Sequence, residues 1–353
     1  MGINVGGLLG PLVTGFLAQS DAFRGRLAGW GLDPDSAWHW GFSAAGVGMC
    51  LGLVQYVRGR SALGEAGRHP AVSAGEAAAA RRQFVRATVV GLALVLLWAV
   101  LAVVDPRLGI TAASFSTVAG YSLLVITVVF FARLFLDRSW TADERRRLSL
   151  IVVFFLAAAL FWSVFEQAGS TLNLFADRST RNEIFGFTFP SSWWQSFNPL
   201  AIIVFGPAFA WMWIRLGRRQ PATPTKFALG LIGVGLGFLV LVPGAARAAA
   251  GIQVGVFWLV ATYLLHTWAE LCLSPVGLSA MTKLAPARIV SLMMGVWFLA
   301  AAVGNYAGGQ IAALYEAMPL ERLLLMVAVL PIGAGAVMLL ARRPLERLVE
   351  GRS

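Results

Sequence analysis

Charged residues are scarce in this chain of 353 residues, where Asp, Glu, Lys and Arg together make up only 13%. Soluble domains usually carry about 25% charged residues, so the composition excludes a soluble domain of useful size. Hydrophobic residues reach 58%, the mean hydropathy is +0.74, and the apolar residues gather in long runs. Runs of about 20 apolar residues cross a bilayer as helices. The chain is therefore predicted to be an all-α integral membrane protein.

Histidine and cysteine, which often hold metals, are also scarce. The three histidines are His39, His69 and His266, and none belongs to a His-Glu-x-x-His motif. The two cysteines, Cys50 and Cys272, both lie in apolar segments and are interpreted as packed thiols rather than a disulfide. No Gly-x-Ser-x-Gly elbow or phosphate-binding Gly-rich loop occurs either. We therefore expect no metal site, no cofactor and no enzymatic activity.

Apolar stretches and the breaks between them predict about ten membrane-spanning helices. They cover residues 3–17, 40–57, 85–104, 115–135, 148–175, 193–216, 227–242, 254–282, 289–314 and 323–341. Small residues at four-residue spacing let helices approach closely. Such spacing occurs at Gly2, Gly6 and Gly10, at Gly233 and Gly237, and at Gly304 and Gly308. Trp193 and Trp194, near the end of a span, are interpreted as anchors at the membrane interface.

Positive charge is distributed unevenly between the loops. The pI near 10.9 is compatible with nucleic-acid binding, but the basic residues lie in short loops between spans. When the loops are assigned alternately to two sides, 21 of the 28 Lys and Arg fall on one side and 7 on the other. Such an excess marks the cytoplasmic side of a membrane. We therefore expect a multi-pass protein of the cytoplasmic (inner) membrane with both ends of this chain in the cytoplasm, and no nucleic-acid partner.

Two carboxylates lie inside apolar stretches, Glu166 within residues 148–175 and Glu270 within residues 254–284. A charge at the middle of a bilayer costs roughly 2.5–3.5 kcal/mol on insertion scales, so such residues face a protein-lined or water-filled interior. Two acids in such positions indicate a path for protons or for a cationic ligand. His266 lies four residues before Glu270 on the same helical face. Together with Ser274 they form a polar stripe, which is either functional or an interhelix set of hydrogen bonds.

Two prolines interrupt another predicted helix. Pro199 and Pro207 each remove a backbone donor and bend the helix, so that freed carbonyls and the amide of Asn198 could line a polar cavity. The alternative is a simple kink with Asn198 bonded to a neighbouring helix.

Several short motifs follow one another along the chain. They are Gly-Ile-Asn-Val-Gly at 2–6, Phe-Trp-Ser-Val-Phe-Glu-Gln at 161–167, Gln-Ser-Phe-Asn-Pro at 195–199, Glu-Leu-Cys-Leu-Ser-Pro-Val-Gly-Leu-Ser at 270–279, Met-Thr-Lys-Leu-Ala-Pro at 281–286, Met-Gly-Val-Trp-Phe-Leu-Ala at 294–300 and Gly-Asn at 304–305. This ordered set covers essentially the whole chain. It resembles the proton-dependent oligopeptide transporter family of the major facilitator superfamily.

The resemblance implies a major facilitator fold, which has twelve spans in two six-helix bundles and, in many bacterial members, two inserted helices between them. On this basis the chain is a partial fold that lacks the first four spans. Its expected parts are the last two helices of the first bundle (1–57), a cytoplasmic linker (58–84), the inserted pair (85–147), the second bundle (148–341) and a cytoplasmic tail (342–353).

The implied function is proton-coupled symport of di- and tripeptides across the cytoplasmic membrane. The family's Glu-x-x-Glu-Arg-Phe signature on the first span and a substrate-site lysine on the fourth have no counterpart in this chain. By resemblance, Glu166 would pair with the missing arginine and take part in proton coupling. Asn4, Asn198 and Glu270 would hold the amino end and backbone of the peptide, and Trp297 would wall the pocket. The expected partners are small peptides, protons and the lipid bilayer, while the sequence indicates no oligomeric state.

Two alternatives stay open. Besides peptide symport, the sequence is compatible with a transporter of the same fold for another substrate, such as nitrate or a drug, and with a non-transporting truncated remnant. Alternating access needs two bundles that rock around a central site. Because the resemblance leaves only two helices in the first bundle, we expect that this chain alone does not transport.

Overall fold

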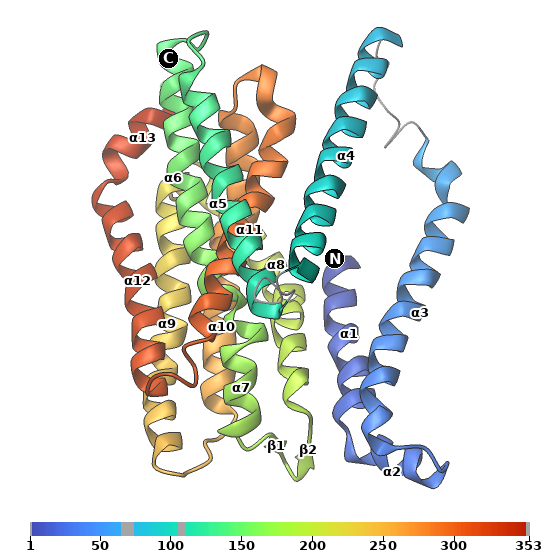
Figure 1. Ribbon diagram of the computed structural model, residues 1–353. Helices are drawn as coiled ribbons and strands as arrows, with labels where there is room; N and C mark the ends of the chain where they lie inside the picture. The colour runs from blue at the N-terminus through green and yellow to red at the C-terminus, as the bar shows by residue number, and fades with distance from the viewer. Residues whose placement is uncertain (1, 65–73, 105–110, 351–353) are drawn as a thin grey trace. The chain divides into compact units, whose positions relative to one another are not determined.

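The structure is a computed structural model that describes residues 2–64, 74–104 and 111–350, and it is built almost entirely of helices (Figure 1). Ten helices of at least 18 residues match the ten predicted spans in order. They are α1 (Gly2–Gln19), α3 (Ala37–Arg58), α4 (Ala74–Val104), α5 (Ala112–Leu136), α6 (Ala142–Phe165), α8 (Phe197–Leu216), α9 (Thr223–Ala249), α10 (Phe257–Leu284), α11 (Val290–Ala312) and α12 (Leu320–Leu340). Seven helical segments of the described chain are long and apolar enough to cross a membrane.

Shorter elements connect these helices. They are the α-helices α2 (Asp21–Gly29), α7 (Thr171–Arg178) and α13 (Arg342–Glu350), the 3-10 turns η1 (Pro34–Ser36), η2 (Arg60–Leu63), η4 (Glu166–Gly169), η5 (Ser191–Ser196), η6 (Gly217–Arg219) and η7 (Ala287–Ile289), and the strands β1 (Glu183–Ile184) and β2 (Phe187–Thr188). The two strands form an antiparallel hairpin that the sequence analysis did not expect. Both of its turn residues, Phe185 and Gly186, have positive φ angles of 50° and 81°. Two-residue hairpin turns of this hand require such angles.

The chain divides into two compact units. One consists of Met1–Ala45 and Thr127–Ser353, and the other of Gly46–Ile126. The predicted division into bundles, linker and inserted pair stays a prediction, and part of the predicted linker lies outside the described residues. Helix α4 begins at Ala74, well inside that linker. Its first turns are rich in alanine, which has the highest helix propensity, and the sequence analysis took this composition for a loop.

The first unit has a continuous aromatic and aliphatic core formed by α6, α9, α10, α11 and α12. Phe154 of α6 stacks on Phe227 of α9 with ring centroids 4.4 Å apart. Phe161, Phe238 and Tyr263 are also fully buried. These contacts join helices that lie far apart in the sequence. They hold together α6, which Glu166 directly follows, and α10, which carries Glu270.

Small residues bring α11 against α6. A Cβ atom on Gly304 would lie 2.5 Å from the carbonyl oxygen of Ala159, and one on Gly308 would lie 2.8 Å from that of Ser163. The close helix approach predicted from this four-residue spacing is confirmed between α6 and α11. The same prediction is wrong for the first span, because nothing among the described residues lies within 4 Å of a Cβ added at Gly2, Gly6 or Gly10.

The predicted helix at 148–175 is broken in the structure. Helix α6 begins with a capping box, in which Thr141 Oγ1 accepts from the backbone N–H of Glu144 and Glu144 Oε2 accepts from that of Thr141. It ends at Phe165, and the turn η4 and the separate helix α7 follow it. The break places Glu166 at the end of a helix rather than along its side.

Two further interpretations need correction. Pro199 lies in the first turn of α8, where backbone N–H groups have no intrahelical acceptor, so only Pro207 lies inside that helix. Both cysteines are free, as expected, but Cys50 is exposed and Cys272 is only partly buried, so the interpretation of Cys50 as a packed thiol is wrong. Cys50 lies on an apolar helix that exposes other large hydrophobic side chains, as a lipid-facing helix does.

The loop between α5 and α6 is tied to the turn after α10. Arg288 stacks over the ring of Trp140, with 3.2 Å from its guanidinium carbon to the ring centroid, and donates to Ser139 Oγ at 2.7 Å. Asp137 lies 3.7 Å from Arg288. Hydrogen bonds from Ser139, with a smaller contribution from Arg288, hold the pKa of Asp137 below its usual value.

Candidate functional site

Asn198 and Glu270, predicted from the sequence as substrate residues, lie side by side between α8 and α10. The Nδ2 group of Asn198 donates to Glu270 Oε2 at 2.9 Å and to Thr267 Oγ1 at 3.1 Å. Thr267 in turn donates to the carbonyl oxygen of Tyr263 at 2.8 Å. Both amide protons of Asn198 are thus used, and its Oδ1 and the second oxygen of Glu270 are left to accept hydrogen bonds from a ligand. We call Asn198, Thr267 and Glu270 the α8–α10 polar cluster.

Asn198 lies just after the point where a 3-10 turn continues into α8. The 3-10 turn η5 ends at Ser196, and Asn198 is the second residue of α8. Ser196 Oγ donates to the carbonyl oxygen of Leu8 at 2.7 Å, and Trp193 Nε1 donates to that of Leu12 at 3.2 Å. These two bonds attach η5 to α1 and fix where α8 begins.

Glu166 is exposed at the start of η4. Within the described part of the chain its carboxylate makes no hydrogen bond or ion pair. The predicted pairing of Glu166 with an arginine of the family's first span, and its part in proton coupling, stay predictions.

Gln167, the next residue, supports the chain around Glu166, and the sequence analysis did not select it as a site residue. Its side chain is fully buried, and Nε2 donates to the carbonyl oxygens of Gly308 at 2.8 Å and Ser163 at 3.1 Å. Its Oε1 accepts from Thr171 Oγ1 at 2.6 Å. The amide of Gln167 therefore joins α6, α7 and α11 at the residue that follows Glu166. The sequence feature that could have identified Gln167 is an amide side chain inside an apolar run.

His266 and Glu270, two residues of the polar stripe predicted along α10, contact two different helices. His266 is buried at 1% exposure, its ring centroid lies 4.9 Å from that of Phe238, and it packs against Gly237, both on α9. Glu270, one turn later, bonds instead to Asn198 on α8. His266 is therefore part of the α9–α10 packing, and Glu270 is the member of the stripe that belongs to the α8–α10 polar cluster.

Asn4 and Trp297, the other two predicted substrate residues, make no hydrogen bond to the α8–α10 polar cluster within the described chain. Asn4 is partly buried on α1, one turn before Gly7, whose added Cβ would lie 3.0 Å from Pro199. Asn4 thus lies near the beginning of α8. Trp297 of α11 is only 4% exposed and packs against Gly277 of α10. Its predicted role as a pocket wall stays a prediction.

The interpretation of Trp194 as an anchor at the membrane interface is wrong. Its side chain is 4% exposed, donates from Nε1 to Asn182 Oδ1 at 2.9 Å, and stacks on Tyr263 with ring centroids 6.0 Å apart. Trp193 is partly buried and bonds to α1, as described above, and its role as an anchor stays a prediction.

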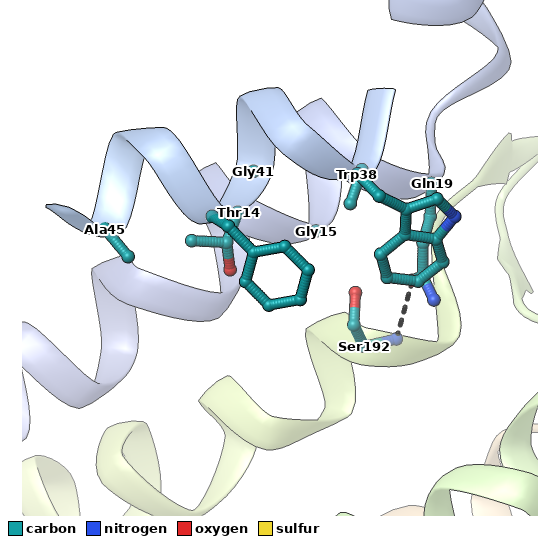
Figure 2. A pocket seen from close by; sticks show the side chains of 9 residues that line it. Thr14, Gly15, Gln19, Trp38, Gly41, Ala45 and Ser192 are labelled. Carbon is teal, nitrogen blue, oxygen red and sulfur yellow. Dashed lines mark hydrogen bonds between the residues drawn. The ribbon is translucent and has the colours of Figure 1, made fainter. Parts of the chain in front are cut away.

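A cavity of about 300 Å³ lies at one end of α1, bounded by α3 and η5. Figure 2 shows Thr14 and Trp38 at its edge and the hydrogen bond from the backbone N–H of Ser192 to Gln19, 3.3 Å long. None of the residues that line it is charged. It therefore offers neither a carboxylate for a peptide ammonium nor a cation for a peptide carboxylate, and we do not assign the substrate to it.

Comparisons with known proteins agree on one family. The family model described as the POT family matches residues 1–326. The uncharacterized transporter YclF of Bacillus subtilis is 35% identical over 99% of this chain and 67% of its own length. The di-/tripeptide transporter of Lactococcus lactis subsp. cremoris is 32% identical over 99% of this chain and 68% of its own length.

A solved structure, described as the peptide transporter POT in complex with sulfate, has a TM-score of 0.82 and 35% identity. The match covers 98% of this chain and 67% of that chain. This chain thus spans about two thirds of the length of the proteins it matches.

Proposed function

The chain belongs to the POT family, and on that premise we propose that it serves in proton-coupled symport of di- and tripeptides across the cytoplasmic membrane. Named relatives support the substrate class, since the similar protein of Lactococcus lactis is called a di-/tripeptide transporter and that of Yersinia enterocolitica a peptide transporter. Relatives named transporters also support a transport role without catalysis. We place the protein in the inner membrane with the C-terminus in the cytoplasm, on the basis of the loop charges.

The observation that carries the proposal is the α8–α10 polar cluster. A carboxylate inside apolar helices is expensive unless it is paired or faces a ligand. Glu270 has one neutral amide partner, Asn198, and an oxygen to spare. The ammonium group of a peptide has three donors and a positive charge, so it complements both the Glu270 carboxylate and Asn198 Oδ1. Asn4, near the beginning of α8, would extend the site to the peptide backbone, and Trp297 would close it.

Proton coupling needs an acid whose protonation changes a link between the two bundles. Glu166 suits this role because it is exposed at a helix end, while Gln167 fixes the backbone behind it. A basic partner supplied by another helix would complete this arrangement.

The test is uptake of a labelled dipeptide into proteoliposomes under an imposed proton gradient, measured with a full-length version of the protein. Replacing Glu270 with Gln removes the charge that attracts the ammonium, and we expect proton-driven uptake to fall at least tenfold, about 1.4 kcal/mol or more. Glu183→Gln is the matched control, because Glu183 is exposed in the hairpin. Uptake by Glu270→Gln equal to that of the control would exclude the assignment.

Glu166→Gln separates coupling from binding in the same assay. We expect it to abolish accumulation against a gradient while peptide counterflow, which needs no net proton movement, continues. Loss of counterflow as well would place Glu166 in peptide binding instead of coupling.

A further inference from the structure

A second cavity, of about 630 Å³, lies at the end of the helix bundle where α8, α9 and α10 meet. It is separate from the α8–α10 polar cluster, none of whose members lines it. Six of the lining residues carry its chemistry, namely Trp213, Gln220, Thr223, Lys226, Ser279 and Lys283. Two of them are cations and none is an acid.

Lys226, in the second turn of α9, is the distinctive group. Only 8% of it is exposed, although its ammonium is charged. Its Nζ donates to Gln220 Oε1 at 2.7 Å and lies 4.4 Å from the ring centroid of Trp213. No carboxylate of the described chain lies within ion-pair distance of it. A neutral amide and an aromatic face are thus its neighbours, and an ammonium has two further N–H groups to donate.

A buried ammonium without an anionic partner is costly, because it loses the water molecules that solvate its charge. Attraction to an aromatic ring offsets only part of that penalty. Residues 206–226 and 271–288 contain six Lys or Arg and no Asp or Glu. Glu346 of α13 accepts a hydrogen bond from Thr225 Oγ1 at 3.5 Å but does not line the cavity. The cavity therefore has an unbalanced positive charge that a bound anion would neutralise.

The position of the cavity indicates which anions can reach it. It lies at the end of the bundle where basic residues are concentrated, the side predicted to be cytoplasmic. On the neighbouring surface of α8, Trp211 is 63% exposed and Arg215 stacks over it at 5.7 Å. Exposed tryptophan and arginine at a helix end are typical of the headgroup level of a membrane. Basic pockets between membrane helices on this side bind anionic headgroups.

We propose that this cavity is a phosphate-binding site in which Lys226 and Lys283 bind the oxyanion of a phosphate group, with Thr223 and Ser279 as additional donors. The phosphate belongs either to the headgroup of an anionic phospholipid or to a free phosphate ion, since both present the same oxygens to the two ammonium groups. This site is independent of peptide binding and of Glu270.

The experiment measures binding by native mass spectrometry and thermal unfolding with the purified 353-residue chain in detergent micelles. The lipid probe is phosphatidylglycerol, compared with zwitterionic phosphatidylcholine. We expect at least fivefold tighter binding of phosphatidylglycerol. Lys226→Gln and Lys283→Gln should each remove most of that preference, and Arg218→Gln, an exposed charge of the same loop that does not line the cavity, should keep it.

Inorganic phosphate, added to micelles without anionic lipid at constant ionic strength, identifies the source of the anion. If it raises the melting temperature and displaces phosphatidylglycerol, and both effects disappear in the lysine variants, the site takes free phosphate. If only the lipid binds, the site takes a headgroup. Lys283 is exposed, so its variant tests the charge without disturbing the interior. The proposal is overturned if the probes bind equally well to Lys283→Gln, Lys226→Gln and Arg218→Gln. It is also overturned if neither phosphatidylglycerol nor inorganic phosphate binds.

Discussion

Single amide side chains organise the polar interior of this protein. Asn198 joins α8 to α10 and orients Glu270, and Gln167 joins α6 to α11 behind Glu166. Each carboxylate thus has a neutral amide nearby instead of a counter-charge from the described chain. A neutral partner such as Asn198 positions the Glu270 carboxylate without cancelling its charge, as the proposed binding of a peptide ammonium requires.

Gln167 provides the residue-scale prediction. Gln167→Leu has a similar volume but leaves the carbonyl oxygen of Gly308 and the hydroxyl of Thr171 without this partner. An unsatisfied buried polar group costs about 1–3 kcal/mol, so we expect a clear drop in the thermal stability of the detergent-solubilised protein. Gln253→Leu, at an exposed loop position, is the control. Equal melting temperatures for the two variants would contradict a structural role for the buried amide.

At the scale of elements, close helix approach decides which faces meet. Helix α11 approaches α6 through Gly304 and Gly308, and α9 accommodates His266 of α10 at Gly237. The same spacing at the start of α1 brings no described neighbour within reach. Glycine spacing alone therefore indicates that a helix is able to pack closely, and the neighbouring helix decides whether it does.

The seam between α6 and α11 can be tested by adding side-chain volume. Gly304→Val would press a side chain against the backbone of α6, where overpacking costs typically 1–3 kcal/mol. Gly309→Val is the matched control, because a Cβ there meets nothing within 4 Å. We expect the first variant to express poorly or unfold at lower temperature, and the second to behave as the parent. The opposite order would show that the two helices are not in contact at Gly304.

At the scale of the whole molecule, the alternation of basic and nearly neutral loops predicts an orientation in the membrane. Arg219 follows α8 on the side with more positive charge, and Arg247 is in the last turn of α9 on the other. Both are exposed, so a label can reach either position from the appropriate compartment.

The orientation prediction uses single cysteines in a background where Cys50 and Cys272 are replaced by alanine. A membrane-impermeant maleimide applied to intact cells should label Arg247→Cys and leave Arg219→Cys unlabelled until the membrane is permeabilised. The reverse pattern would place the C-terminus outside the cytoplasm. Labelling of both positions in intact cells would contradict the predicted number of crossings between them.

The sequence by itself determined the class of protein, the order of its ten long helices and the family, because these depend on local composition and on ordered motifs. A run of apolar residues long enough to cross a bilayer must form a helix there, since a helix makes all of its backbone hydrogen bonds within the one segment. The sequence also identified Glu270 and Asn198 as candidate site residues, because a polar group inside an apolar run is costly whichever way the helix faces.

Only the tertiary structure decided which polar groups meet. It separated His266 from Glu270, buried Trp194, ended α6 at Phe165 and enclosed Lys226 with no acidic partner in the described chain. Several of these outcomes depend on contacts between helices, such as that of Glu270 with Asn198, which is 72 residues away along the chain. Helical periodicity gives the face of a residue but not the element that this face contacts, and contacts between elements require the packed fold.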